Sequence, residues 1–500
     1  MNSDPARQAA LRQLRRGTFL FPPWGLYLLW TGSRFGMVGK LFGTVFIAGV
    51  SLIYTALIGA ALVRMEWLKV EWRGGYVPAF TRTPTLPDYD ALERHRGQTA
   101  GTSSTNAAGA SARGAAYWTA FRGPDGDGHY RERSLRTNWA EVRPRVMWKQ
   151  PVGGGYASFI VVHGLAITLE QRRKEEVVAA YDLETGRQVW AHAYYGLFTE
   201  SLGGEGPRAT PAYADGHVFA LGGLGTLKCL SVTQGQERWS TNILLDAHAQ
   251  LPFYGCAASP LVVGDAVVVA AGGPRQSSFV AYHRQSSTKL WQTLEDEAAY
   301  STPVLARIAG RSQILAATKD RVVGLDPERG TLIWSHSWVV KMGNRNIAQP
   351  VVVGDKRVFL SASYGTGCEM IEIGTQPDGS WVARTLWKNL SMKNKFTSSV
   401  LIDGTLYGLD EDRLACVDVE TGERRWKGER YGYGQILAAG RHVIILCGNG
   451  DVAFIEVSPE APRELLRMEA LRGKTWNQHA MADGRLLIRN AVEMACIDLR

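Results

Sequence analysis

The hydrophobic pattern divides the chain into one long apolar run near the N-terminus and a much longer region of short, alternating stretches. Residues 41–63 are 23 consecutive residues without a charged side chain. A helix of this length rises about 35 Å, which exceeds the roughly 30 Å hydrocarbon core of a bilayer. The run therefore predicts one transmembrane helix over 41–63.

The charges around this run predict its orientation. Six Lys/Arg residues lie in 1–40, whereas the charges that follow residue 63 are of mixed sign. The positive-inside rule places 1–40 in the cytoplasm as a basic N-terminal segment, and everything after residue 64 outside. We expect a single-pass protein of a bacterial inner membrane with a periplasmic C-terminal part. A cleaved signal peptide is the alternative, but the basic leader and the apolar run are both too long for one.

Two further segments border the predicted helix. Residues 18–30 are apolar but too short to span, and Pro22 and Pro23 interrupt them. Their aromatic side chains suit the inner membrane interface, and a plain loop is the alternative. Residues 74–116 contain several prolines and then small polar residues without periodicity, so 64–116 is expected to be a flexible stalk.

From residue 117 onward the short stretches repeat. One element is an apolar strand, a D-x-x-T-G turn and a strand ending in Trp, with its clearest copies at 180–190, 324–334 and 416–426. Asp caps the turn and Gly takes the positive φ, so the element predicts a hairpin. A second element, in which a small polar residue precedes two apolar strands joined by a Gly turn, occurs at 210–219, 259–268, 349–359 and 398–407.

The two elements together make a unit of four strands. Positions equivalent to the turn Asp fall near 182, 231, 284, 326, 372, 418, 456 and 498. A four-stranded sheet that recurs about every 45 residues is typical of a propeller blade. We therefore expect an all-β fold, an eight-bladed β-propeller over 117–500, preceded by the one transmembrane helix. A solenoid that does not close is the alternative.

The ends of the array predict that the ring closes. The sequence stops at M-A-C-I-D-L-R, one strand short of a full blade, and V-M-W-K-Q-P-V-G at 146–153 stands in front of the first blade. We expect the strand around Trp148 to complete the last blade beside Asp498. Closure covers strand edges that would otherwise invite aggregation, and an open solenoid would not need this strand.

Composition narrows the function. Residues 1–73 hold nine Lys/Arg and three acids, which account for +6 of the net charge of +9. The basicity is therefore a membrane-topology signal, and no nucleic-acid partner is expected. The six cysteines include no C-x-x-C, which excludes covalent c-type haem and the usual zinc spacings. Cys229, Cys416 and Cys496 share one repeated strand position and are interpreted as small buried residues.

The repeat resembles a known family. Blades of the form (S/T)-P-x-V-x-x-G-x-V-(F/Y) followed by A-x-D-x-x-T-G-x-x-x-W are similar to the PQQ-type quinoprotein β-propeller repeat. The lead-in W-T-A-F-R-G-P-D-G-D-G-H-Y at 118–130 is similar to the start of many bacterial PQQ-like repeat proteins. The resemblance implies the fold and leaves two functions open. One is a non-catalytic scaffold, such as the lipoprotein of the outer-membrane β-barrel assembly machinery. The other is a PQQ-dependent alcohol dehydrogenase with the quinone and Ca²⁺ on the propeller axis.

The sequence lacks several parts that the resemblance implies for the dehydrogenase. It contains no vicinal Cys-Cys pair, and Glu205 and Asp246 are the plausible acids in the loops before the inner strands. The D-G-D-G run at 125–128 lacks the later ligands of a calcium loop and is interpreted as a turn. The leading hypothesis is therefore a membrane-tethered scaffold that docks membrane or periplasmic proteins. PQQ and Ca²⁺ are cofactors only under the dehydrogenase alternative.

Alignment of the second element places certain residues at the entry to each inner strand, where the channel opens. An arginine, a lysine and several aromatic rings facing one axis suit an anionic aromatic ligand or a loop of a partner protein. Side chains that only line a solvated channel are the alternative. The candidates are Tyr156, Arg208, Tyr300, Asn346, Lys395, Tyr433, Trp476 and Asn477.

Overall fold

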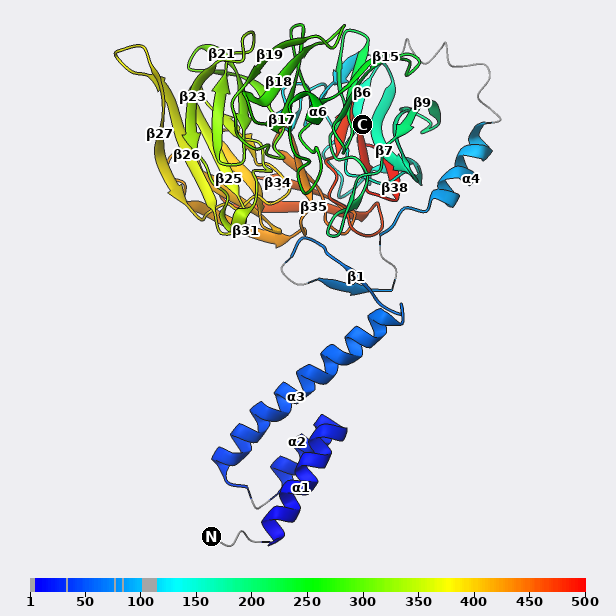
Figure 1. Ribbon diagram of the computed structural model, residues 1–500, viewed down its shortest axis with the longest axis vertical. Coiled ribbons are helices and arrows are strands. Elements are labelled where there is room, and N and C mark those ends of the chain that lie inside the picture. The colour runs from blue at the N-terminus through cyan, green and yellow to red at the C-terminus, as the bar shows by residue number, and fades with distance from the viewer. Residues whose placement is uncertain (1–4, 33–34, 76–77, 83–84, 101–114) are drawn as a thin grey trace. The chain divides into compact units, whose positions relative to one another are not determined.

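The computed structural model describes residues 5–32, 35–75, 78–82, 85–100 and 115–500, which belong to two compact units (Figure 1). The first unit is Met1–Trp72 with Tyr76–Pro84, and the second is Arg73–Gly75 with Thr85–Arg500. Residues 101–114, the small polar part of the predicted stalk, lie outside the described residues.

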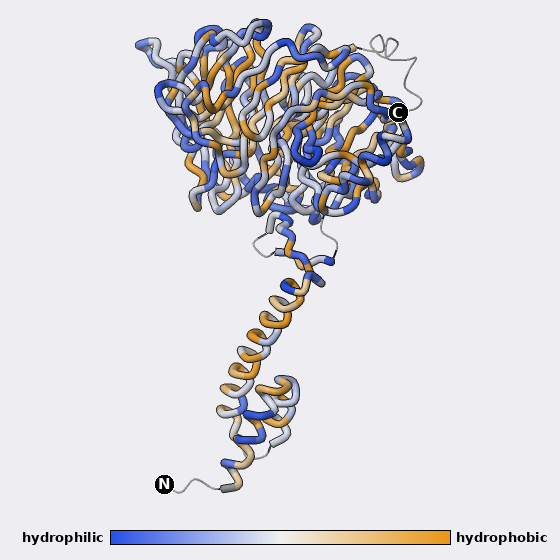
Figure 2. Tube along the Cα trace, turned by 45° about the vertical axis from the view of Figure 1, so that its right-hand side comes forward, coloured by the Kyte–Doolittle hydropathy of each residue, from blue (hydrophilic) through white to orange (hydrophobic). Residues whose placement is uncertain are grey.

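The first unit contains the predicted transmembrane helix. Its elements are α1 (Pro5–Leu20), α2 (Pro22–Thr31), α3 (Met37–Arg64), β1 (Lys69–Glu71) and β2 (Ala79–Thr81). In the described part of the chain, α3 alone is long and apolar enough to cross a membrane. It is coloured hydrophobic along most of its length in Figure 2. The helix begins at Met37, four residues before the predicted start at 41, and it ends at Arg64, one residue after the predicted end.

Residues 18–30 contain the end of α1 and most of α2, which contradicts the plain loop. Pro22 occupies the first turn of α2, where a proline costs no hydrogen bond, so α1 ends and α2 begins at this point. The Phe19 ring lies 6.3 Å from the Phe46 ring, and the Tyr54 hydroxyl donates to the Phe19 carbonyl. The turn between α1 and α2 therefore packs beside the middle of α3, and the placement of 18–30 at the inner membrane interface stays a prediction.

The second unit is an eight-bladed propeller, as the repeat predicts. Each blade is an antiparallel sheet of four strands, and the first strands of successive blades contact one another around the axis. Blades 1 to 4 are β6 (Ile160–Val162), β7 (Leu165–Arg172), β8 (Glu175–Asp182) and β9 (Gln188–Tyr195); β12 (Ala212–Ala214), β13 (His217–Leu221), β14 (Thr226–Ser231) and β15 (Glu237–Asn242); β16 (Leu261–Val263), β17 (Ala266–Gly273), β18 (Ser277–His283) and β19 (Lys289–Thr293); and β20 (Val304–Ile308), β21 (Arg311–Ala317), β22 (Arg321–Leu325) and β23 (Leu332–Ser337).

Blades 5 to 8 continue the ring, and two short strands from the lead-in extend blades 1 and 7. These four blades are β24 (Val351–Val353), β25 (Arg357–Ala362), β26 (Gly367–Thr375) and β27 (Trp381–Asn389); β28 (Val400–Ile402), β29 (Thr405–Asp410), β30 (Arg413–Asp418) and β31 (Arg424–Arg430); β32 (Gln435–Ala439), β33 (His442–Leu446), β34 (Asp451–Val457) and β35 (Pro462–Glu469); and β36 (Ala480–Ala482), β37 (Arg485–Arg489), β38 (Glu493–Asp498) and β5 (Arg145–Pro151). The extending strands are β3 (Ala116–Trp118) and β4 (His129–Tyr130).

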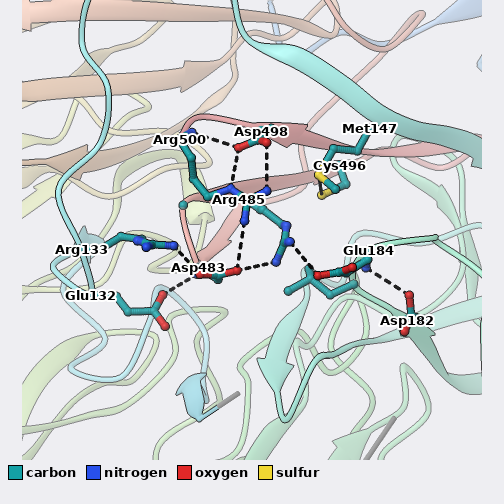
Figure 3. Close-up of polar contacts among 12 residues, drawn as sticks. Glu132, Arg133, Met147, Asp182, Glu184, Asp483, Arg485, Cys496, Asp498 and Arg500 are labelled. Atoms are coloured by element: carbon teal, nitrogen blue, oxygen red, sulfur yellow. Dashed lines mark hydrogen bonds and ion pairs between the residues drawn. The ribbon is translucent and has the colours of Figure 1, made fainter. Parts of the chain in front are cut away.

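The predicted closure is confirmed. Strand β5 is the outer strand of blade 8 and pairs antiparallel with β38, with Trp148 opposite Cys496. Polar side chains strengthen the seam between blades 8 and 1. Figure 3 shows Arg485 of blade 8 reaching both Asp483 (2.6 Å) and Glu184 of blade 1 (3.0 Å). The two ends of the array are therefore joined by backbone and side-chain bonds.

The core consists of apolar layers between neighbouring blades, and the repeat Trp residues belong to these layers. Five of the eight joints between blades use the same hydrogen bond, from a Trp indole to a carbonyl in the turn of the next blade. The Trp148 indole nitrogen donates to the Leu183 carbonyl (3.0 Å), and a Cβ on Gly186 would approach the same ring to 2.7 Å. Glycine in the D-x-x-T-G turn is thus required by its positive φ and by the ring of the preceding blade.

The segment predicted as a stalk contains regular structure. Strands β1 and β2 pair within the first unit, and α4 (Tyr89–Ala100) belongs to the propeller unit. Arg173 of blade 1 forms ion pairs with Asp90 and Glu93 of this helix, at 2.5 and 2.9 Å. Residues 89–100 are therefore docked on the propeller and do not form a free tether.

Candidate functional site

The inner strands begin in a belt of polar side chains that joins the blades around the axis. The Ser158 amide donates to the Thr210 hydroxyl, the Thr210 amide to Ser259, and the Ser259 amide to Thr302, each at 2.9 Å. The Gln349 amide makes the same bond to Ser398. The small polar residue of the second repeat element therefore supplies an acceptor for the preceding blade, which explains its recurrence.

Replacing Thr302 with valine is expected to lower the free energy of unfolding by about 1–3 kcal/mol, because the buried Ser259 amide would lose its acceptor. Thr302→Ser keeps the hydroxyl and should stay within about 1 kcal/mol of the wild type. Urea denaturation of the detergent-solubilised chain measures both. Equal losses in the two variants would show that the belt bond is not responsible.

An aromatic layer covers the channel above this belt. The rings of Tyr156 and Trp476 stack with 5.6 Å between their centroids, and Trp476 also lies 4.8 Å from Phe396. Phe396 in turn lies 6.0 Å from Tyr433. These four rings come from the loops that enter blades 1, 6, 7 and 8, so the structure brings together three of the predicted residues and adds Phe396. We call this layer, with Lys395 and Lys474, the axial mouth.

Two lysines lie against the rings of the axial mouth. Lys395 is 3% exposed, with its ammonium 4.7 Å from the Tyr433 ring centre and 5.0 Å from that of Tyr364. Burial lowers the pKa of Lys395 from its usual value. Lys474 was missed by the sequence analysis, and its ammonium lies 4.5 Å from the Trp476 ring centre. Both cations therefore lie beside aromatic rings, and the Lys474 ammonium also donates to the Leu202 and Gly203 carbonyls at 3.4 Å.

Arg208 also enters the site, but its charge is already neutralised. Its guanidinium lies 4.4 Å from the centre of the Phe198 ring and pairs with Glu200 at 2.9 Å. Both side chains of this ion pair are nearly inaccessible to solvent, and burial lowers the pKa of Arg208. An anionic ligand would therefore compete with Glu200 for this arginine.

The remaining candidates organise the loops around the site. Asn346 donates to the Thr318 carbonyl at 2.8 Å, and Asn477 donates to the Ala157 carbonyl at 3.1 Å. The Tyr300 hydroxyl accepts the Tyr254 amide. Asn346 and Asn477 are buried, and their side-chain amides donate to backbone carbonyls. Their side chains therefore hold the loops and do not line the axial mouth with the aromatic rings.

The two acids singled out in the sequence are engaged elsewhere. Glu205 accepts a hydrogen bond from the Tyr89 hydroxyl, and Asp246 accepts hydrogen bonds from Thr241 and Tyr282. Within the part of the chain that the structure describes, no three His, Cys, Asp or Glu side chains are grouped as metal ligands. Glu205 and Asp246 are therefore already engaged by hydrogen bonds within the protein.

The chain's own residues lie on the axial mouth. Gly74 has a φ of +90°, and a Cβ at this position would come within 2.6 Å of Tyr433 and 3.0 Å of Phe396. The Thr85 hydroxyl accepts the Lys474 amide at 2.8 Å. We call the propeller-unit residues 73–75 and 85–89 the strap. Nothing in the sequence predicts this placement, because the strap has neither periodicity nor repeat.

The lead-in 116–130 pairs with inner strands at the other end of the propeller. It adds β3 to blade 1 and β4 to blade 7, at the C-terminal ends of the inner strands. Arg122 is buried and donates to the carbonyls of Ser398 and Ser399 at 3.2 and 3.0 Å. Gly126 and Gly128 have positive φ, and Asp127 accepts the His129 amide, so the D-G-D-G run forms turns.

The cysteines behave as buried apolar residues. All six are free and buried, which confirms the interpretation of Cys229, Cys416 and Cys496. Burial raises the pKa of Cys256 to about 12, so its thiol stays protonated at neutral pH.

Comparisons with known proteins agree with this architecture. The model of the family described as outer membrane protein assembly factor BamB matches residues 173–428, just over half of the chain. No curated protein matches the chain in sequence.

Among solved structures, the chain is similar to BamB from Moraxella catarrhalis, with 16% identity, a TM-score of 0.49, and coverage of 71% of this chain and 98% of that chain. It is also similar to the quinohemoprotein alcohol dehydrogenase from Comamonas testosteroni, with 12% identity, a TM-score of 0.52, and coverage of 80% and 84%. A third similar structure is the quinohemoprotein alcohol dehydrogenase ADHIIG from Pseudomonas putida HK5. Its identity is 11%, its TM-score is 0.52, and the match covers 77% of this chain and 80% of that chain. At these identities the likeness to the dehydrogenases is one of fold.

Proposed function

Because the chain belongs to the PQQ-type propeller family described as outer membrane protein assembly factor BamB, we propose that it is a non-catalytic, membrane-tethered docking scaffold. In this proposal 1–40 is cytoplasmic, 41–63 anchors the chain in the bacterial inner membrane, and the propeller over 117–500 is periplasmic. The family description concerns the assembly of membrane proteins, which favours partners among membrane or periplasmic proteins.

One observation favours this proposal over the enzyme alternative: two segments from outside the blades lie on the propeller axis. The strap lies on the axial mouth, and Arg122 of the lead-in donates to the Ser398 and Ser399 carbonyls at the start of the inner strand of blade 6. A quinoprotein needs an open axial site for its quinone and for substrate. A scaffold needs only a rigid outer surface, which a closed ring of blades provides.

A dehydrogenase remains the second candidate because of the stacked rings of Tyr156 and Trp476 with Lys474 beside them. Planar rings and ammonium groups suit an anionic aromatic quinone. Against it, Glu205 and Asp246, the acids singled out for that role in the sequence, are bonded to tyrosines. We therefore derive no catalytic step.

The test uses the full chain with an affinity tag, expressed in its own membranes. We expect specific proteins to co-purify after detergent extraction and to be absent with an unrelated single-pass protein carrying the same tag. The purified chain mixed with PQQ and Ca²⁺ should show neither quinone absorbance nor dye reduction with alcohols. Quinone binding that disappears in the Arg208→Ala/Lys395→Ala double variant would overturn the scaffold proposal in favour of the enzyme.

A further inference from the structure

The most exposed apolar side chains of the propeller share one kind of loop. Among the described propeller residues, every large apolar side chain that is more than half exposed, apart from Leu86 of the strap, lies at the end of an outer strand or on the connection from it to the inner strand of the next blade. Their exposed fractions run from 56% to 81%. They are Tyr195, Leu245, Phe253, Val339, Met342 and Leu390.

These connections all lie at one end of the propeller. Antiparallel pairing places the end of each outer strand beside the start of the next inner strand, and this is the end that carries the axial mouth. The opposite end carries the D-x-x-T-G turns, where Asp182, Asp326 and Asp418 accept hydrogen bonds from their own turn amides. The most exposed apolar side chains are thus concentrated at the first end, which we call the apolar loop face.

The chain enters the propeller unit on the apolar loop face, because the strap contacts Tyr433 and Lys474 there. Helix α3 ends at Arg64, nine residues before Arg73, where the strap begins. Nine extended residues span at most about 30 Å. A tether this short limits how far the loop face can move from the membrane that holds α3.

We propose that the apolar loop face lies against the lipid surface of that membrane. The proposal rests on the membrane tethering proposed above. Leucine, phenylalanine, methionine, valine and tyrosine side chains partition favourably into the headgroup and acyl boundary. Exposed Lys341, next to Met342, reaches the level of lipid phosphates. The bilayer covers apolar surface that the propeller leaves exposed to solvent.

The test places an environment-sensitive dye at single cysteines of the full chain in nanodiscs of phosphatidylcholine and phosphatidylglycerol. The native cysteines are buried, so a new surface cysteine is labelled selectively. Phe253→Cys and Met342→Cys report on the loop face. Leu290→Cys and Leu332→Cys are matched controls at the starts of β19 and β23, near the opposite end, and the native leucines are 47% and 42% exposed.

The dye at 253 and 342 is expected to shift to the blue and to lose most of its fluorescence when the nanodisc lipids carry a nitroxide quencher. The dye at 290 and 332 should remain in a water-like environment. Water-like emission at all four positions overturns the proposal, as does a blue shift at 253 that lipid quenchers leave unchanged and that requires a co-purified protein. Protease protection of residues 1–40 in the same sample tests the tethering separately.

Discussion

Replacing Arg489 with alanine is expected to lower the free energy of unfolding by about 3–5 kcal/mol, the largest single effect in the propeller. Arg489 is fully buried in blade 8, and its guanidinium donates to the Thr168 hydroxyl and to the Gly153 carbonyl of blade 1, both at 2.8 Å. Burial alone would raise the pKa of Glu170, but the charges of Arg172 and Arg489 outweigh it and lower that pKa. The alanine variant would leave this buried carboxylate with one arginine at the seam where the ring closes.

Urea denaturation and limited proteolysis of the solubilised chain measure this loss. Arg500→Ala is the control, because Arg500 lies at the same seam but is partly exposed and pairs with Asp498. It should change stability by no more than about 0.5–1 kcal/mol. Arg489→Lys keeps the charge without the forked donors and should fall between the two. A stability of Arg489→Ala within 1 kcal/mol of the wild type would mean that the seam does not depend on this residue.

Gly330→Ala is expected to cost about 2–5 kcal/mol, because two independent penalties meet at this turn. Gly330 has a φ of +69°, where an alanine is strained by about 1–3 kcal/mol. Its new Cβ would also overlap the ring of Trp291 from the preceding blade. Forcing an extra methyl group into a packed joint costs about 1–3 kcal/mol more.

Gly354→Ala separates the two penalties. Gly354 has a similar φ of +61°, but a Cβ there meets no atom within 4 Å. It should therefore show the backbone penalty alone and be about 1–3 kcal/mol more stable than Gly330→Ala by thermal and urea unfolding. Equal losses would mean that the contact between turn and ring contributes nothing to the joint.

The repeat was predictable because most blades use the same local devices. The Asp of the turn, the Trp after it and the Ser or Thr before the inner strand make hydrogen bonds, and the Gly takes a positive φ against the ring of the preceding blade. Closure was predictable for the same reason: a sheet that lacks its outer strand and a strand that lacks its sheet satisfy each other. The position of residues 146–153 in the last blade could therefore be predicted from the sequence alone.

The strap and the lead-in were not predictable in the same way. Their contacts are single events, such as Gly74 beside Tyr433 or Arg122 on the Ser398 carbonyl, and they leave no period in the sequence. Docking of α4 depends on ion pairs with Arg173, which lies more than 70 residues further along the chain. A polar segment rich in small residues looks like a tether until the surface that binds it is known.

The axial mouth was predicted in part. Alignment identified Tyr156, Tyr433 and Trp476, which lie together, but it also selected Asn346 and Asn477, whose amides hold loop backbone. Lys474 could have been predicted from the sequence, because side chains two residues apart on an extended segment, such as Lys474 and Trp476, point to the same side. Its contact with Trp476 follows from that spacing. Phe396 could not, since it directly follows Lys395 and only the loop conformation brings both side chains to the ring layer.

The pairing of β5 with β38 has a consequence for how the molecule is made. It joins positions such as Met147 and Cys496, which are 349 residues apart. A ribosome adds about 5–20 residues per second, so β5 waits about 20–70 seconds for its partner strand to be synthesised. During that interval both margins of the incomplete ring are open to other chains. Biogenesis of this protein should therefore depend on a chaperone that occupies those margins until translation ends.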